Sequence, residues 1–153
     1  MKAYRVHEYG KDAKFIEDEI NKPKVKKGHV VIGVKASSLN PVDHKILKGK
    51  VRINPALPGI LHMDVAGVII EVGEGVTAFK KGDEIYGCAG GLQGEAGNID
   101  GALAEYMLAD SNLIALKPKA LSFSEAAALP LVAITAWEGL FDRAHIKKED
   151  HIL

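Results

Sequence analysis

Polar and ionisable side chains crowd one short stretch, Ser37 to Lys45, directly after an apolar run that is typical of a buried strand, His29 to Lys35. Asn40 offers an amide with two hydrogens to donate and an oxygen that accepts, which suits it to orient a polar ligand. Asp43 can accept hydrogen bonds from loop amides and so support the shape of the segment. A plain Asn-Pro turn with a solvated Lys45 would explain the same residues, so this pattern alone leaves function and structure both open.

Composition and charge narrow the class of protein that carries this stretch. The chain has 153 residues, of which 47% are hydrophobic, enough for one hydrophobic core. Twenty Lys and Arg balance 20 Asp and Glu, so no basic field favours nucleic acid or an anionic membrane. No apolar run approaches the ~18 residues of a membrane span. We therefore expect a small-molecule partner, with no nucleic acid and no membrane.

Cys88 is the single cysteine of the chain. It cannot form a disulfide within the chain, which favours a reducing compartment, and we expect the cytoplasm. No neighbour in the sequence would lower the pKa of its thiol, so a small packed residue is a better interpretation than a reactive one.

Short β-branched runs separated by glycine-rich turns predict a mainly β fold, a sandwich or a barrel. The expected strands are 30–34, 65–72, 83–86 and 103–108. Tight reversals are expected around Gly73 to Gly75 and at Gly82.

Helical signals are confined to the C-terminal part. Ser122 followed by Glu125 has the spacing of a capping box, which predicts a short helix that begins near Ser122. After Pro130, a second helix is expected over 133–141, with Ile134, Trp137 and Phe141 on one buried face.

The last residues, 147–153, indicate a polar turn and then an apolar strand that has only begun at His151-Ile152-Leu153. A strand that is only begun cannot bury its apolar face. We therefore expect this sequence to be part of a longer protein.

Six segments in order resemble a known family. They are Ser38-Leu39-Asn40-Pro41-Val42-Asp43, Met63 to Val68 running into Glu71-Val72-Gly73, Gly82 to Gly87, Gly101 to Tyr106, Ala126 to Pro130, and Thr135-Ala136. Together they resemble the medium-chain dehydrogenase/reductases, in particular the zinc-independent quinone oxidoreductase and enone (alkenal) reductase branch. The resemblance implies a GroES-like, partly open β-barrel over residues 1–121. Residues 122–153 would be a helical connection and the first residues of a Rossmann nucleotide-binding domain. We expect the sequence to be truncated there, before the rest of that domain.

The resemblance also implies an activity, the NADPH-dependent reduction of quinones or α,β-unsaturated carbonyls by hydride transfer, and a homodimer for the full-length enzyme. Asn40 resembles the asparagine beside the nicotinamide, and Thr135 the threonine that faces it from the other side. Lys45 resembles a lysine that binds the cofactor ribose and assists proton delivery, a role for which its positive charge beside an enolate is suited. The sequence has no Gly-x-Gly-x-x-Gly between a strand and a helix, so we expect it to be inactive alone.

Zinc ligands of the related alcohol dehydrogenases are not found at the matching positions. Asn40 stands near the first ligand cysteine, and Met63 aligns with the ligand histidine, while His62 is one position away. Methionine is a poor zinc ligand beside imidazole, so we expect no zinc. The segment 49–52 lacks the aromatic residue of several quinone oxidoreductases, which favours an enone or alkenal substrate.

Two other hypotheses stay open at this point. The chain could belong to a zinc alcohol dehydrogenase relative with unusual ligands. It could also be a self-standing GroES-like module that binds a partner and catalyses nothing.

Overall fold

A computed structural model describes residues 1–51, 53–94 and 97–152 of the chain. Its centre is a five-stranded antiparallel sheet with the strand order β10-β6-β5-β3-β9. These strands are β3 (His29–Ser37), β5 (Asp64–Val72), β6 (Glu84–Cys88), β9 (Tyr106–Asp110) and β10 (Ile114–Leu116). All four predicted strands are thus present, the last of them shifted toward the C-terminus.

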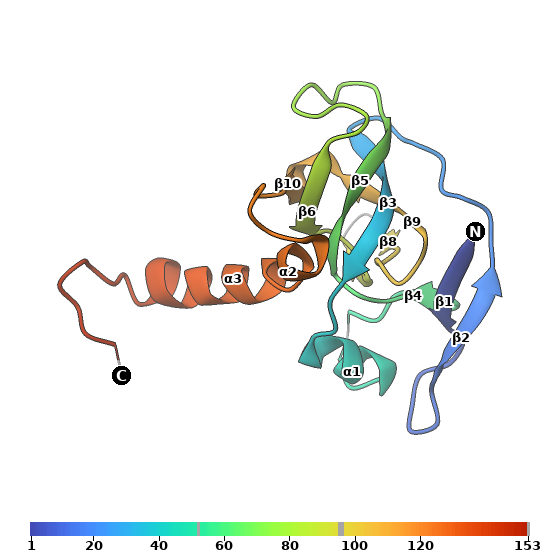
Figure 1. Cartoon of the computed structure of the whole chain (residues 1–153). Helices are drawn as coiled ribbons and strands as arrows, with labels where there is room; N and C mark the ends of the chain where they lie inside the picture. The colour runs from blue at the N-terminus through green and yellow to red at the C-terminus, as the bar shows by residue number, and fades with distance from the viewer. Residues whose placement is uncertain (52, 95–96, 153) are drawn as a thin grey trace.

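Two smaller sheets accompany the central one. The order β2-β1-β4 joins β2 (Phe15–Glu19), β1 (Lys2–Val6) and β4 (Gly59–Ile60), and β7 (Leu92–Gly94) pairs with β8 (Gly97–Ile99). The helical segments are α1 (Pro41–Leu47), the 3-10 turn η1 (Ser111–Leu113), α2 (Phe123–Ala127), α3 (Pro130–Trp137) and the π-helical η2 (Glu138–Arg143). Figure 1 shows α1 below the sheets and α3 extending away from them. The predicted mainly β, GroES-like fold is confirmed.

The main core lies on one face of the central sheet and consists of side chains that alternate along β3 and β5. It contains Val30, Ile32, Val65, Ile69, Ile85 and Met107. Close pairing of β3 with β5 requires glycine at one point, because a Cβ on Gly67 would lie 2.4 Å from the carbonyl oxygen of Gly33. A second cluster, Val6, Ile46, Leu61 and Met63, fixes α1 against the strand β1.

The first predicted helix is confirmed as α2. Ser122 is its N-cap: the backbone N–H of Glu125 donates to Ser122 Oγ at 3.2 Å, and the N–H of Ser122 donates to Glu125 Oε2 at 2.8 Å. Ala126 and Ala127 pack on Ala66 of β5. The capping box therefore starts the helix, and the two alanines allow it to lie close to the sheet.

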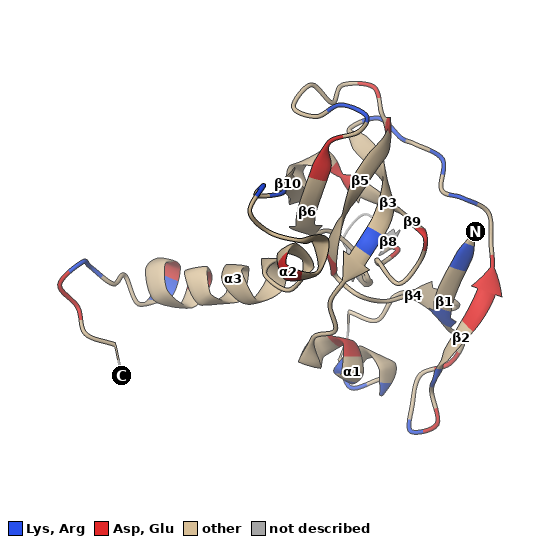
Figure 2. Ribbon diagram, viewed as in Figure 1, with Lys and Arg blue, Asp and Glu red and all other residues tan. Residues whose placement is uncertain are grey.

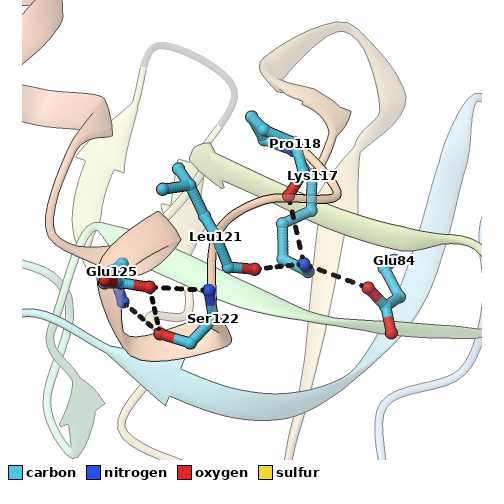
Figure 3. A network of polar contacts seen from close by, with 6 residues as sticks. All are labelled: Glu84, Lys117, Pro118, Leu121, Ser122 and Glu125. Atoms are coloured by element: carbon cyan, nitrogen blue, oxygen red, sulfur yellow. Dashed lines mark hydrogen bonds and ion pairs between the residues drawn. The ribbon is translucent and has the colours of Figure 1, made fainter.

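Lys117 connects α2 to the sheet through a buried ammonium (Figure 3). Its side chain is only 5% exposed, and Nζ lies 3.1 Å from Glu84 Oε2 on β6. Nζ also donates to the carbonyl oxygens of Leu121 at 2.5 Å and Pro118 at 3.2 Å. One cation thus holds the turn between β10 and α2 against the sheet.

The predicted burial of the second helical face is wrong. Ile134, Trp137 and Phe141 are 54%, 61% and 43% exposed, and the helix begins at Pro130 rather than at residue 133. Only the first turn of α3 is held against the sheet, through the buried Pro130 and the half-buried Leu131. The rest extends away from the described part of the chain (Figure 1), so nothing there covers the apolar face. Trp137 and Phe141 instead pack on each other, with ring centroids 4.4 Å apart.

His151 and Ile152, where a strand was expected, are not in a strand, and no strand in the described part of the chain pairs with them. Leu153 lies outside the described residues, as does Arg52 of the segment used to judge quinone preference. In the described part of the chain, no helix is both long and apolar enough to cross a bilayer. Basic and acidic residues are interspersed over the ribbon, apart from an acidic run on β2 (Figure 2).

Candidate active site

Asn40 and Asp43 together start helix α1. Asn40 is the buried N-cap in an extended conformation, and its backbone N–H donates to Asp43 Oδ2 at 2.8 Å. The other oxygen, Asp43 Oδ1, accepts from the backbone N–H of His62 at 3.2 Å. The predicted role of Asp43 as support for this segment is confirmed, because its carboxylate joins the loop before α1 to the chain before β5.

The side chain of Asn40 is held by a second buried carboxylate, Asp64, at the start of β5. Asn40 Nδ2 donates to Asp64 Oδ2 at 2.9 Å and to Ser38 Oγ at 3.3 Å. Ser38 Oγ itself donates to the same Asp64 oxygen at 2.7 Å. Because both amide hydrogens are directed at these partners, what Asn40 can still offer a ligand is its acceptor oxygen.

Asp64 also reaches the helix that carries Thr135. Its second oxygen, Oδ1, accepts from the backbone N–H of Leu131 at 2.9 Å, in the first turn of α3. One turn later, the exposed Thr135 donates its hydroxyl hydrogen to the carbonyl oxygen of Leu131 at 2.8 Å. The structure therefore connects Asn40 and Thr135 through one carboxylate and one backbone residue.

Asp64 was not predicted from the sequence as part of this site. It lies in one of the six family-like segments, but no role was assigned to it. The available signal was a carboxylate directly before the apolar run Val65 to Ile70, since a charge beside a buried strand is rarely tolerated without partners.

Lys45 lies apart from this network, on the outer side of α1. Asp43 and Ile46 face inward and are buried, whereas His44 and Lys45 are exposed. Among the described residues, Lys45 Nζ has no hydrogen-bond or ion-pair partner, so no polar contact of its ammonium joins it to Asn40 or Thr135. Its predicted role stays a prediction.

His62 is a buried histidine in a backbone conformation that favours glycine, with φ of 72°. Such a conformation costs about 1–3 kcal/mol, which the surrounding contacts must offset. Ring Nδ1 lies 2.9 Å from Ser37 Oγ, and the ring meets Phe15 edge to face. Burial lowers the pKa of His62, although the carboxylates of Asp43 and Asp64 oppose the shift. The imidazole is therefore a neutral structural group at neutral pH.

Cys88 pairs with Asp64 across the β5–β6 ladder. Burial, together with the charge and hydrogen bond of Asp64, raises the pKa of the Cys88 thiol to about 11. The interpretation of Cys88 as packed and unreactive agrees with this environment.

The same residues already have partners that would compete with a metal ion. Met63 is buried, and all the oxygens of Asp64 and Asp43 are already engaged by hydrogen-bond donors. Within residues 1–51, 53–94 and 97–152, no group of three or more His, Cys, Asp or Glu side chains is arranged to hold a metal ion. The residues of this site do not fit a catalytic zinc.

Comparison with known proteins gives the family. The model of the alcohol dehydrogenase GroES-like domain matches residues 26–119, and the chain belongs to this family and to the medium-chain dehydrogenase/reductase superfamily, as predicted.

The chain spans less than half the length of two curated relatives. A 2-methylene-furan-3-one reductase from Solanum lycopersicum is 44% identical over 92% of the chain, and an NADPH-dependent alkenal/one oxidoreductase of Arabidopsis thaliana, described as chloroplastic, is 42% identical over the same share. The chain covers 37% of the length of each.

Two solved structures have the same fold. An alcohol dehydrogenase superfamily protein from Novosphingobium aromaticivorans superposes with a TM-score of 0.87 at 38% identity, over 96% of this chain and 43% of that one. The quinone oxidoreductase of Coxiella burnetii superposes with a TM-score of 0.81 at 31% identity, over 98% of this chain and 47% of that one.

Proposed function

We propose that this chain is the substrate-side domain of a zinc-independent, NADPH-dependent reductase that transfers hydride to an α,β-unsaturated carbonyl or a quinone. Residues 1–121 would form the catalytic GroES-like domain, and residues 122–153 would lead into a nucleotide-binding domain. The observation that carries this proposal is the Asp64 network, because it ties together two residues, Asn40 and Thr135, that the family resemblance assigns to the nicotinamide.

The acceptor oxygens of the network suit a nicotinamide carboxamide. Asn40 donates its amide hydrogens to Asp64 and Ser38, and Thr135 donates its hydroxyl hydrogen to the carbonyl oxygen of Leu131. Both side chains would therefore act as acceptors for the carboxamide N–H groups and so orient the ring. NADPH, when bound, supplies the hydride, and these residues contribute positioning.

Lys45 would supply charge and a proton. Addition of hydride to the β-carbon of an enone leaves negative charge on the carbonyl oxygen, which a nearby ammonium stabilises. Lys45 is exposed, and its ammonium has no partner among the described residues, so it is available for this task; the same group would contact the cofactor ribose. We assign it the catalytic role.

An enone or alkenal is the substrate class that we favour over a quinone. The relatives named as a 2-methylene-furan-3-one reductase and an alkenal/one oxidoreductase are 44% and 42% identical, whereas a chloroplast envelope quinone oxidoreductase homolog of Arabidopsis thaliana is 37% identical. The segment from Gly49 also lacks an aromatic side chain that could stack on a quinone ring.

The test is NADPH oxidation by the whole protein that carries this chain, with an alkenal, a cyclic enone and a quinone as acceptors. Lys45→Ala should lower kcat/KM by about tenfold or more, in the range of one general acid. Lys81→Ala, an exposed lysine in the turn before β6, is the matched control and should leave the rate unchanged. A protein that neither binds NADPH nor oxidises it with any acceptor would overturn the proposal and favour a non-catalytic binding module.

A further inference from the structure

The geometry points to Asp64 as a positioning residue that sets the orientation of the Asn40 amide and the placement of helix α3 together. This inference rests on the proposed function for its kinetic consequence, but its structural part concerns the residues of this chain alone. Asp64 would touch neither substrate nor cofactor, and it would act only through Asn40 and Leu131.

The carboxylate accepts from three donors that belong to two segments distant in sequence. Asp64 is 0% exposed, and it accepts from the hydroxyl of Ser38, the amide of Asn40 and the backbone N–H of Leu131, at 2.7, 2.9 and 2.9 Å. The first two lie 26 and 24 residues away along the chain, and the third lies 67 residues away. A single side chain therefore fixes the loop before α1 and the helix after the barrel relative to each other.

Stability requires an acceptor at this position, because three donors face the buried Asp64. No Lys or Arg in the described part of the chain forms an ion pair with Asp64, so neutral donors and the N-terminal end of α3 must offset its desolvation. An apolar group in its place would leave these donors without an acceptor and would lower stability. Nor can an apolar group replace the direction that the carboxylate imposes on its donors.

That direction decides which end of the Asn40 amide faces a ligand. Because an ionised carboxylate accepts only, it forces the amide nitrogen toward itself. Asn40 then presents oxygen, the atom required to accept from a carboxamide. An asparagine at position 64 could donate as well as accept, so the Asn40 amide would no longer have one preferred orientation.

The same carboxylate fixes the start of α3. Its charge lies at the N-terminal end of the helix, where it is favourable, and its bond to Leu131 sets the position of the first turn along the helix axis. Thr135 lies one turn further, about 6 Å along the helix. Movement of the first turn would carry Thr135 with it, while the Asn40 amide would lose its anchor.

The first measurement follows the side-chain amide of Asn40 by NMR in the whole protein without nucleotide. In the wild type, the Asn40 amide protons should exchange with solvent about tenfold or more slowly than those of the exposed Asn21, since they are buried and bonded. Asp64→Asn should abolish this difference. Wild-type protection of Asn40 in Asp64→Asn would overturn the inference, whether or not the protein proves to be a reductase.

The second measurement follows hydride transfer from NADPH deuterated on either face of the nicotinamide. Asp64→Asn should lower kcat by about 10- to 100-fold and reduce the facial selectivity of transfer, because the ring is no longer held in one orientation. Ser38→Ala removes a single donor and should give a smaller change in the same direction, which keeps the test available if Asp64→Asn folds poorly.

A matched control separates positioning from stability. Ile69→Val lies in the same strand and is fully buried, but it belongs to the main core. It should lower the melting temperature without changing kcat or facial selectivity. An active wild type whose Asp64→Asn and Ser38→Ala variants only melt earlier would refute the role of Asp64, whereas an inactive wild type would refute the proposed function.

Discussion

Replacement of Lys117 by methionine should destabilise the fold and should act on the junction between the sheet and α2. Methionine keeps the length of the aliphatic chain but removes the ammonium that contacts Glu84, Leu121 and Pro118 (Figure 3). The side chain of Lys117 is almost completely buried, with only 5% of it exposed.

The size of the effect follows from what each partner loses. Glu84 is 52% exposed, so water replaces the ion pair and its loss costs about 0–1 kcal/mol. The carbonyl oxygen of Leu121 is partly buried and would lose a charge-assisted hydrogen bond, at a cost of about 1.5–3 kcal/mol. Burying an apolar group in place of a charge offsets part of this loss of stability. We expect a net loss of about 2 kcal/mol, or a fall of about 4–8 °C in Tm for a chain of this size.

Thermal and urea unfolding followed by circular dichroism measure this difference. Lys119→Met, an exposed lysine two residues later, is the control and should change Tm by less than about 2 °C. Hydrogen exchange should show faster opening of α2 in Lys117→Met than in the wild type. If Lys117→Met is as stable as the wild type or more stable, the desolvation of the ammonium outweighs its hydrogen bonds and the reasoning fails.

Three further predictions concern single residues. Cys88, whose pKa is about 11 rather than the ordinary 9.0, should react with iodoacetamide about 100-fold more slowly at pH 8 than it does in urea, and equal rates would contradict its burial. The fluorescence of Trp137, the one tryptophan, should be quenched by acrylamide in this chain almost as readily as that of free indole; strong protection would show that its face is covered. The lowered pKa of His62 means that the unfolded chain binds a proton more readily, so its contribution to stability should be lost as the pH falls below about 6.5; a His62→Gln variant with the same acid sensitivity as the wild type would disprove this.

Local patterns were sufficient for much of the fold. The β-branched runs, the turn glycines and the Ser122–Glu125 capping box each act over a few residues, and the strands and the α2 start follow from them. The apolar spacing of Ile134, Trp137 and Phe141 was also correct as a helical pattern. What it could not show is whether another part of the chain lies against that face, because a periodic pattern records a preference for burial and not the presence of a partner.

The sequence by itself determined the residue types of the candidate site, the family and the support that Asp43 gives to α1, since Asp43 acts on a neighbour three residues away. Only the tertiary structure decided that Asp64 is the common partner of Asn40 and Leu131, because that contact spans 67 residues and depends on where β5 begins and where α3 leaves the barrel. The fold also decided that His62 has a left-handed backbone conformation and that Cys88 lies opposite the buried carboxylate of Asp64. The physical reason is the same in each case: hydrogen bonds, burial and pKa depend on distances between segments, and these are set by the packing of the whole domain.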